Sequence, residues 1–224
     1  MRGWRILLGL MLAAAVSAAA GWAYVGGWAP SRADYAVQGI DVSQANGSID
    51  WAMVKARDVD FAYVRATAGT DQRDGQFVSN WAGMASAGIR RGALHVFSLC
   101  SSAAAQAGAF VAMVPRDPEA LPAAIDLDFH DDCPARPERG VVLDRVRQLA
   151  AIVETHSGKP VVLRVSRAFD ERYGVSESIP RPLWVVGDFV RPDYAARPWR
   201  MWRSNSLRRI DGVEGTVNWS VVAP

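Results

Sequence analysis

The sequence predicts an α/β protein: an irregular (β/α) barrel of TIM-barrel type with five βα units and three further strands. Apolar, β-branched segments alternate with helical segments between residues 38 and 166, a pattern typical of parallel βα units. Three more extended segments follow, which brings the number of strands to eight, the number that closes such a barrel. About 190 residues remain once the apolar N-terminus is set aside, enough for one domain with a large core.

The elements follow in order along the chain. The five strands of the βα units are expected at residues 38–43, 60–67, 91–99, 121–128 and 159–166. Helices are expected at residues 51–58, 77–88, 103–114 and 139–158. Asp50 and either Ser101 or Ser102 are N-cap candidates, Gly88 closes the second helix, and Pro115 stops the third. Residues 182–189, 198–205 and 215–221 supply the last three extended segments.

The N-terminus indicates export. Two arginines in "MRGWR" precede residues Ile6 to Val25, which carry no charge. Small residues at Val16 to Ala18 are suited to cleavage of a signal peptide. Twenty apolar residues, with Trp22, Tyr24 and Trp28 at the far end, are instead typical of a membrane anchor, which we favour. We therefore divide the chain into a signal or anchor at residues 1–28, a linker at 29–38 and a barrel at 39–224. The expected location is the cell envelope, either anchored in the inner membrane facing the periplasm or secreted into the periplasm.

Two cysteines, Cys100 and Cys133, fit an oxidising compartment. Each follows a predicted strand, and an even pair in an exported protein predicts one disulfide. Two independent buried thiols are the alternative. The 25 Lys and Arg and 23 Asp and Glu residues are scattered, so no basic stripe with interleaved aromatics predicts nucleic-acid binding.

Polar residues stand at the ends of several predicted strands. These are Asp41 and Ser43, Arg65 and Thr67, His95 and Ser98, Asp126 and Asp128, and, on the last strand, Asn218. In such barrels the chemistry lies at the carboxyl ends of the strands, so we expect these side chains to converge on one mouth. Asp41, Asp126, Asp128 and Asn218 should line one cleft there.

Five motifs at these strand ends resemble family-25 glycoside hydrolases, the bacterial and phage muramidases that cut peptidoglycan. They are "GIDVSQANGSIDW", "FAYVRATAGT" with a following Asp-Phe-Asn-Trp-Gly pattern, "GALHVFS", "LPAAIDLD" and "KPVVL". Together they run from Gly39 to Val221 in the family's order, and the cysteine pair with the N-terminal segment resembles a Gram-negative, membrane-proximal branch. The resemblance implies an irregular α/β barrel that acts on the β-1,4 bond after N-acetylmuramic acid.

The resemblance also implies roles for individual residues. Asp41, Asp126, Asp128 and Asn218 occupy the positions of the family's acidic cleft, with Asp128 where the family has the glutamate that protonates the leaving oxygen. The substrate-binding candidates are Ser43, Arg65, His95, Ser98, Trp184, Trp202 and Trp219. Trp202 and Trp219 are the better candidates for a sugar-stacking rim, since Trp184 also fits the core, and His95 also fits a structural role.

The sequence departs from the family pattern at the site itself. Asp128 replaces the glutamate, Asn218 replaces an aspartate, and Ala68, Leu163 and Arg203 stand where relatives often have glutamate, tyrosine and glutamine. Aspartate is one methylene shorter than glutamate, and a misplacement of about 1 Å can cost about 10²-fold in rate.

Two hypotheses therefore follow. The chain is either a muramidase-type hydrolase of reduced or altered activity, or a catalytically lapsed relative that binds cell-wall glycan or an envelope partner. We expect no cofactor and no metal, although an Asp-x-Asp pair can also bind a divalent cation in a sugar-nucleotide enzyme. The expected partners are peptidoglycan glycan strands and, through the N-terminal segment, the membrane; we expect a monomer and no nucleic acid.

Overall fold

One sheet that closes on itself forms the body of the protein. The computed structural model describes residues 2–130 and 133–224, so Met1, Asp131 and Asp132 lie outside it. Within those ranges the strands are β1 (Gln38–Val42), β2 (Phe61–Ala68), β3 (Gln72–Arg73), β4 (Arg90–Val96), β5 (Ala124–Leu127), β6 (Val162–Val165), β7 (Leu183–Val186), β8 (Met201–Arg208) and β9 (Val217–Val222). The pairing of β1 with β2 closes eight of them into a barrel, and β3 is added to the edge of β2. The predicted barrel is confirmed.

The direction of the strands explains why the barrel departs from a regular (β/α)8 barrel. Strands β1, β2, β4, β5, β6, β7 and β8 are parallel to their neighbours, whereas β9 runs antiparallel to both β8 and β1. The connection between β8 and β9 is short, and a short connection can only join antiparallel strands. The last βα repeat of a regular barrel is therefore missing.

Helices cover the outside of the parallel part. They are α2 (Trp51–Lys55), α3 (Phe77–Ser86), α4 (Ala103–Met113), α5 (Arg139–Ser157), α6 (Arg167–Tyr173) and α7 (Val175–Ser178), with a 3-10 turn η1 at Gln44–Asn46. Asp50, Ser102 and Ser166 cap α2, α4 and α6 by accepting backbone N–H groups. Helix α6, which was not predicted, supplies the helix of the fifth βα unit.

The core has two layers. Inside the barrel, one buried cluster comprises Phe61, Tyr63, Leu94, Ala124, Val162, Trp184 and Met201. A larger cluster lies between the outer face of the sheet and the helices. Both faces of the parallel strands are therefore buried, which is why these strands are nearly continuous in apolar residues.

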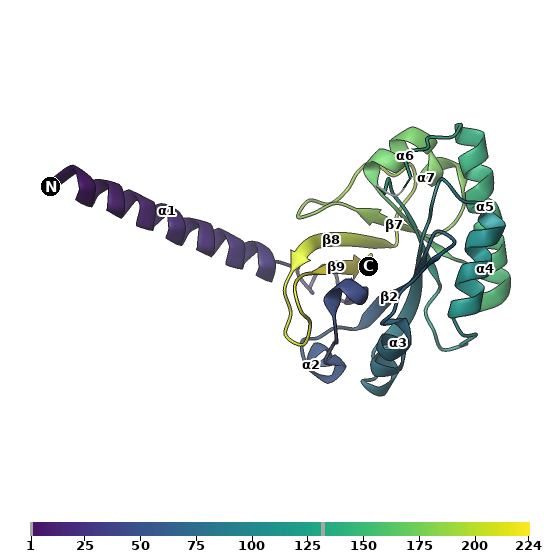
Figure 1. Ribbon diagram of the computed structural model, residues 1–224, viewed down its shortest axis with the longest axis horizontal. Coiled ribbons are helices and arrows are strands. Elements are labelled where there is room, and N and C mark those ends of the chain that lie inside the picture. Colours follow the sequence, from purple (N-terminus) through teal and green to yellow (C-terminus); the bar gives the residue numbers. More distant parts are fainter. Residues whose placement is uncertain (1, 131–132) are drawn as a thin grey trace.

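The N-terminal helix α1 (Arg2–Gly27) projects from the barrel beside β8, on the side opposite α4 and α5 (Figure 1). Its segment Leu7–Gly27 is long and apolar enough to cross a membrane and is not buried against the barrel. The following residues pack on the barrel: Tyr35 stacks on Trp199 at 6.4 Å, and Gln38 Nε2 donates to the Pro30 and Tyr35 carbonyls.

Candidate active site

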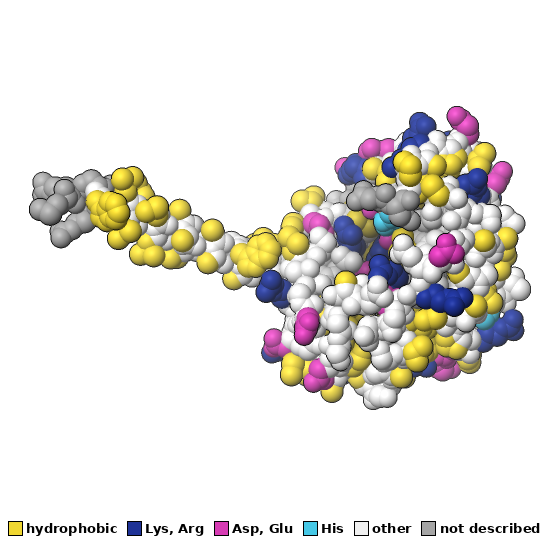
Figure 2. Space-filling model, in the orientation of Figure 1, with side chains coloured by type: hydrophobic (Ala, Val, Ile, Leu, Met, Phe, Trp, Pro, Cys, Tyr) yellow, Lys and Arg dark blue, Asp and Glu magenta, His cyan; other side chains and the backbone are white. Residues whose placement is uncertain are grey.

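A cleft of about 640 Å³ opens at the mouth of the barrel. The residues that line it include Asp41 on β1, Arg65 on β2, Asp126 on β5, Arg164 on β6 and Asn218 on β9. Figure 2 shows a hollow on this face where basic, acidic and histidine side chains meet. A concave site of this size with convergent polar groups is typical of a site for a small molecule or a chain segment.

Strand alternation places these side chains inside the barrel. Successive residues of a strand point to opposite faces, so Asp126 points inward like Ala124, two residues earlier. Asp126 is paired in register with Arg164, which brings the two side chains next to each other. The apolar cluster below them closes the barrel and makes these polar residues the floor of the cleft.

Arg164 joins the two aspartates in a buried network. Its Nε and one terminal nitrogen donate to both oxygens of Asp126 at 2.7 and 2.8 Å, and its other terminal nitrogen donates to Asp41 Oδ1 at 2.7 Å. All three residues are buried, and the guanidinium lies 5.0 Å from the centre of the Trp184 ring. The planar donor arrangement of arginine matches this bidentate arrangement.

This network sets the charge state of the floor. Burial by itself would raise the pKa of Asp126, but the charge and hydrogen bonds of Arg164 hold that pKa below its usual value. Burial likewise opposes the charge on Arg164, and the two aspartates outweigh it and raise the arginine pKa. Asp126 is therefore an ionised carboxylate near neutral pH and is not a proton donor.

Arg164 was missed by the sequence analysis. The sequence signal for its role was that it is the single charged residue in the otherwise apolar strand of residues 161–165. A charge buried in such a strand requires a partner of opposite charge. Its partners lie 38 and 123 residues away in the sequence, so the sequence alone did not identify them.

Asn218 also lies on the floor, although it does not stand at the carboxyl end of its strand. It is the second residue of β9, and because β9 is antiparallel, its amino end meets the carboxyl end of β1. Asn218 Nδ2 donates to Asp41 Oδ1 at 2.8 Å. The other oxygen, Asp41 Oδ2, accepts no hydrogen bond from the described residues.

Asp128 does not line this cleft, contrary to the prediction that four residues would do so. Strand β5 ends at Leu127, and Asp128 lies in a bend where alternation no longer holds. Its Oδ1 accepts from Ser166 Oγ at 2.6 Å and from the Phe129 amide at 2.8 Å. The carboxyl group is thus held between the ends of β5 and β6.

His95 and Ser98, two predicted substrate-binding residues, are buried outside the cleft. His95 Nδ1 is 2.8 Å from Thr67 Oγ1, and its Nε2 is 3.2 Å from Gln106 Oε1, which also accepts from the Ser98 amide. Burial lowers the pKa of His95 to about 4, although the bond to Gln106 opposes the shift. This neutral histidine joins β4 to α4, so the structural role is the one observed.

The predicted tryptophan rim is wrong. Trp184 lies inside the barrel, and Trp202 and Trp219 are 4 % and 2 % exposed. Their indole nitrogens donate to Ser220, Gly187 and Gln38, respectively, within the protein. A sugar ring has no access to these faces because adjacent strands and the segment after α1 cover them.

Further residues line the cleft. Ser43 and Arg65 do so as predicted, and Arg65 Nε pairs with the buried Asp74 at 3.2 Å. Two lining residues were not predicted: His130, whose Nε2 lies 3.9 Å from Asp126 Oδ2, and Glu214, an exposed residue between β8 and β9.

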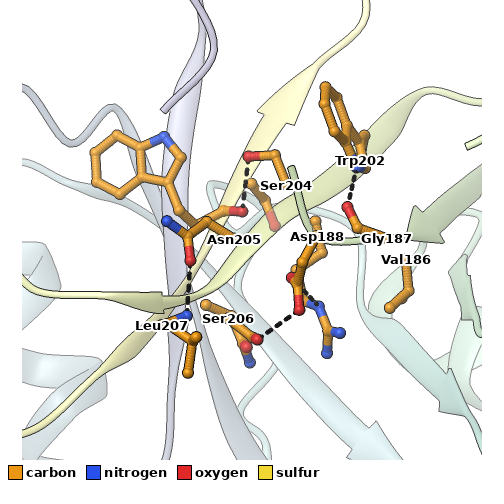
Figure 3. A network of polar contacts seen from close by, with 12 residues as sticks. Val186, Gly187, Asp188, Trp202, Ser204, Asn205, Ser206 and Leu207 are labelled. Carbon is orange, nitrogen blue, oxygen red and sulfur yellow. Dashed lines mark hydrogen bonds and ion pairs between the residues drawn. The ribbon is translucent and has the colours of Figure 1, made fainter. Parts of the chain in front are cut away.

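The other departures from the family pattern occupy different places. Ala68 lines the cleft, whereas Leu163 faces away from it into the outer core layer. Arg203 Nε lies 3.9 Å from Asp188 Oδ1. Figure 3 shows the same region of β8, where Ser206 donates to Asp188 at 2.7 Å; Ser206 also lines the cleft.

Comparison with known proteins points to one family. The family model described as "Glycosyl hydrolases family 25" matches residues 40–213. The uncharacterized protein YegX of Escherichia coli K12 is 32% identical over 195 residues, which cover 84% of this chain and 70% of YegX. A family 25 glycosyl hydrolase from Bacillus anthracis superimposes with a TM-score of 0.80 at 28% identity, over 88% of this chain and 92% of that one. The Streptomyces coelicolor lysozyme gives a TM-score of 0.76 at 28% identity, over 83% and 91%.

Proposed function

The chain belongs to glycosyl hydrolases family 25, and on that premise we propose that it acts on peptidoglycan glycan strands as a lysozyme-type domain. The observation that carries the proposal is the cleft at the barrel mouth, whose floor holds Asp41 and Asp126 at the positions of the family motifs. The bond at issue is the β-1,4 linkage of the glycan.

Asp128 is the proton donor in this proposal. Glycosidic cleavage needs a carboxylic acid that protonates the leaving oxygen and a second carboxylate that assists at the sugar carbon. Asp126, paired with Arg164, serves as the ionised group, so the proton comes from Asp128 once its carboxyl group turns from Ser166 toward the cleft. Turnover is slower than in relatives with glutamate, because Asp128 is shorter and Arg164 reduces the negative charge that would stabilise an oxocarbenium-like state.

The test is turnover of peptidoglycan by the full chain in detergent, measured as released reducing ends and by zymography. We expect slow release that Asp128→Asn abolishes. The matched control is Asp144→Asn, a residue on α5 whose side chain is 78 % exposed. Equal rates for Asp128→Asn and the native chain would remove Asp128 from the mechanism.

A second function, glycan binding without turnover, is favoured by the Arg164 network. Arg164 occupies Asp41 Oδ1 and both oxygens of Asp126, and Asp128 is held by Ser166. Such a domain would co-sediment with peptidoglycan and release no reducing ends. Co-sedimentation together with measurable hydrolysis would exclude it.

Repair of the site separates the two functions further. We expect Asp128→Glu with Asn218→Asp to raise hydrolysis well above that of the native chain, because the acid regains its reach and the floor regains a charge. Asp128→Glu alone should recover part of the rate and Asn218→Asp alone little, since groups that act as a unit are not additive. A folded but inert double variant would place the defect at Arg164, which both changes leave in position.

We also infer that α1 anchors the protein in a membrane, with residues 39–224 as the barrel domain and 29–38 as the connection. The apolar segment Leu7–Gly27 and the disulfide between Cys100 and Cys133 support this arrangement. The barrel then faces the periplasm, where it acts as a monomer on the adjacent glycan.

A further inference from the structure

The junction between α1 and the barrel is a fixed joint. The buried Asn205 on β8 donates its amide to the carbonyls of Val25 and Trp28, at 2.8 and 3.0 Å, and its oxygen accepts from the Leu207 amide. The Arg209 amide donates to the Gly26 carbonyl at 2.9 Å. Strand β8 therefore satisfies carbonyls at the end of α1 that would otherwise need water or a cap.

Exposed apolar side chains surround this joint. Phe189 and Val190, in the loop after β7, are 37 % and 74 % exposed, and Leu207 on β8 is 36 % exposed. The Phe189 ring contacts Trp28, the residue after α1, with ring centres 5.4 Å apart. Figure 2 shows hydrophobic side chains where α1 meets the barrel. The apolar surface of α1 thus continues onto the barrel.

The loop that presents Phe189 is strained. Phe189 has φ of 65°, a left-handed conformation that is rare for a bulky residue. The Val190 amide donates to the Asp188 carbonyl at 2.8 Å, which makes a tight three-residue turn, and the Phe189 amide donates to the Ser204 carbonyl on β8. Strain of this kind persists where the surrounding structure enforces it and is often functional. Here it directs apolar side chains outward.

We propose that these residues form a membrane-contact face: Phe189, Val190 and Leu207, together with Arg209, rest in the interface of the bilayer that α1 spans. The proposal relies on the anchor part of the proposed function and not on glycan cleavage. Helix segment Leu7–Gly27 has 21 residues and so is about 31 Å long, close to the roughly 30 Å hydrocarbon thickness. Trp28 then lies at the bilayer surface, and Phe189, in contact with it, lies there too.

Charge and side-chain type agree with this partner. Trp22 and Tyr24, in the last turns of α1, are exposed, and aromatic residues of this kind gather at membrane interfaces. The Arg209 guanidinium lies 5.8 Å from the Trp22 ring centre, and a long arginine side chain can extend from such a position toward lipid phosphates. The face would hold the barrel directly on the membrane and prevent it from swinging on a free tether.

The test places a photo-reactive benzoylphenylalanine at position 190 of the full chain, reconstituted in vesicles of phosphatidylethanolamine and phosphatidylglycerol. The matched control carries the same group at Val78, which is 69 % exposed on α3. We expect lipid adducts by mass spectrometry at position 190 and none above background at position 78. Unfolding curves for both variants should match the native chain, because both positions are exposed.

The outcomes separate the parts of the proposal. If the chain resists alkaline carbonate extraction but forms no adduct at position 190, or equal adducts at both positions, the contact face is refuted and the anchor stands. Release of the chain by carbonate would refute both. Neither result bears on hydrolysis, which is measured separately.

Discussion

Arg164 places a buried positive charge between the two carboxylates on the floor of the cleft. It is the charged residue of an otherwise apolar strand, and it forms three charge-assisted hydrogen bonds in a site from which water is largely excluded. A buried network of this kind adds little net stability, because desolvation offsets the attraction. Its loss is nevertheless costly, since two buried carboxylates then lack a partner.

We expect Arg164→Met to lower the free energy of unfolding by about 3–5 kcal/mol. Arg164→Met combined with Asp126→Asn should cost less than the sum of the two single changes, since the pair interacts directly. Urea unfolding curves measure these values. The control is Arg147→Met on α5: this side chain is 48 % exposed and its partner Asp144 is 78 % exposed, so we expect a cost of about 1 kcal/mol or less. Equal losses of unfolding free energy at the two positions would contradict the role of Arg164 in holding the two buried aspartates.

His95 gives the protein a pH dependence in weak acid. Its folded pKa of about 4 lies below its unfolded value of about 6.5, so the unfolded chain binds the proton first. The stabilising contribution is complete above pH 6.5 and is lost as the pH falls from there toward 4, by about 3 kcal/mol. The measured free energy of unfolding should therefore decrease as the pH is lowered from 6.5 to 4.

His95→Gln should remove most of this slope, since the amide keeps hydrogen bonds and takes up no proton. His156→Gln is the control, because that histidine is partly exposed. The assignment fails if both variants retain the native slope.

At the scale of elements, strand direction and loop attachment decide which side chains share the mouth. The antiparallel β9 places Asn218 against Asp41, and the loops after β4 and β5 are joined by the predicted disulfide, with Cα atoms 5.7 Å apart. Cys133 lies three residues after His130, and its amide donates to the His130 carbonyl at 3.3 Å. The disulfide therefore restrains the segment that would carry the proton donor.

Replacing both cysteines, Cys100→Ser with Cys133→Ser, should lower the free energy of unfolding by about 3–4 kcal/mol. The estimate follows from the sequence separation of 33 residues between the linked cysteines. Dithiothreitol should destabilise the native chain to the level of the double variant and leave the variant itself unchanged. A native chain insensitive to reduction, under conditions that break the bond, would contradict this.

At the scale of the whole molecule, the distinctive feature is the long exposed helix α1. Its segment Leu7–Gly27 has a mean hydropathy of 1.7 and is not buried. The barrel carries no excess of either charge, with 25 basic and 23 acidic residues in the chain. Anchoring by α1, more than attraction by a charged surface, would then bring the cleft to its substrate.

We expect the full-length protein to fractionate with membranes and to resist alkaline carbonate. Leu12→Arg should shift part of it to the soluble fraction, since a central arginine costs about 2.5–3.5 kcal/mol on insertion. Val78→Arg, on the barrel, is the control. Mass spectrometry of the N-terminus tests the alternative, a cleaved signal peptide: a soluble form that begins near residue 19 to 21 would indicate cleavage.

The sequence by itself determined the barrel, the disulfide partners and the aspartates Asp41 and Asp126 at its mouth. Local periodicity defines strands and helices, and the carboxyl ends of parallel strands meet on one side, so strand-end residues could be placed without coordinates. The resemblance of the motifs indicated the family, which the family model over residues 40–213 confirms.

Only the tertiary structure decided how these residues are used. Arg164 reaches Asp41 across 123 residues of sequence, Asp128 turns to Ser166 where β5 stops, and Trp202 and Trp219 are covered by neighbouring segments. Each outcome depends on which strands pair and in which register. Pairing is a contact between distant segments, and a local pattern carries no information about what the opposite side chain will be.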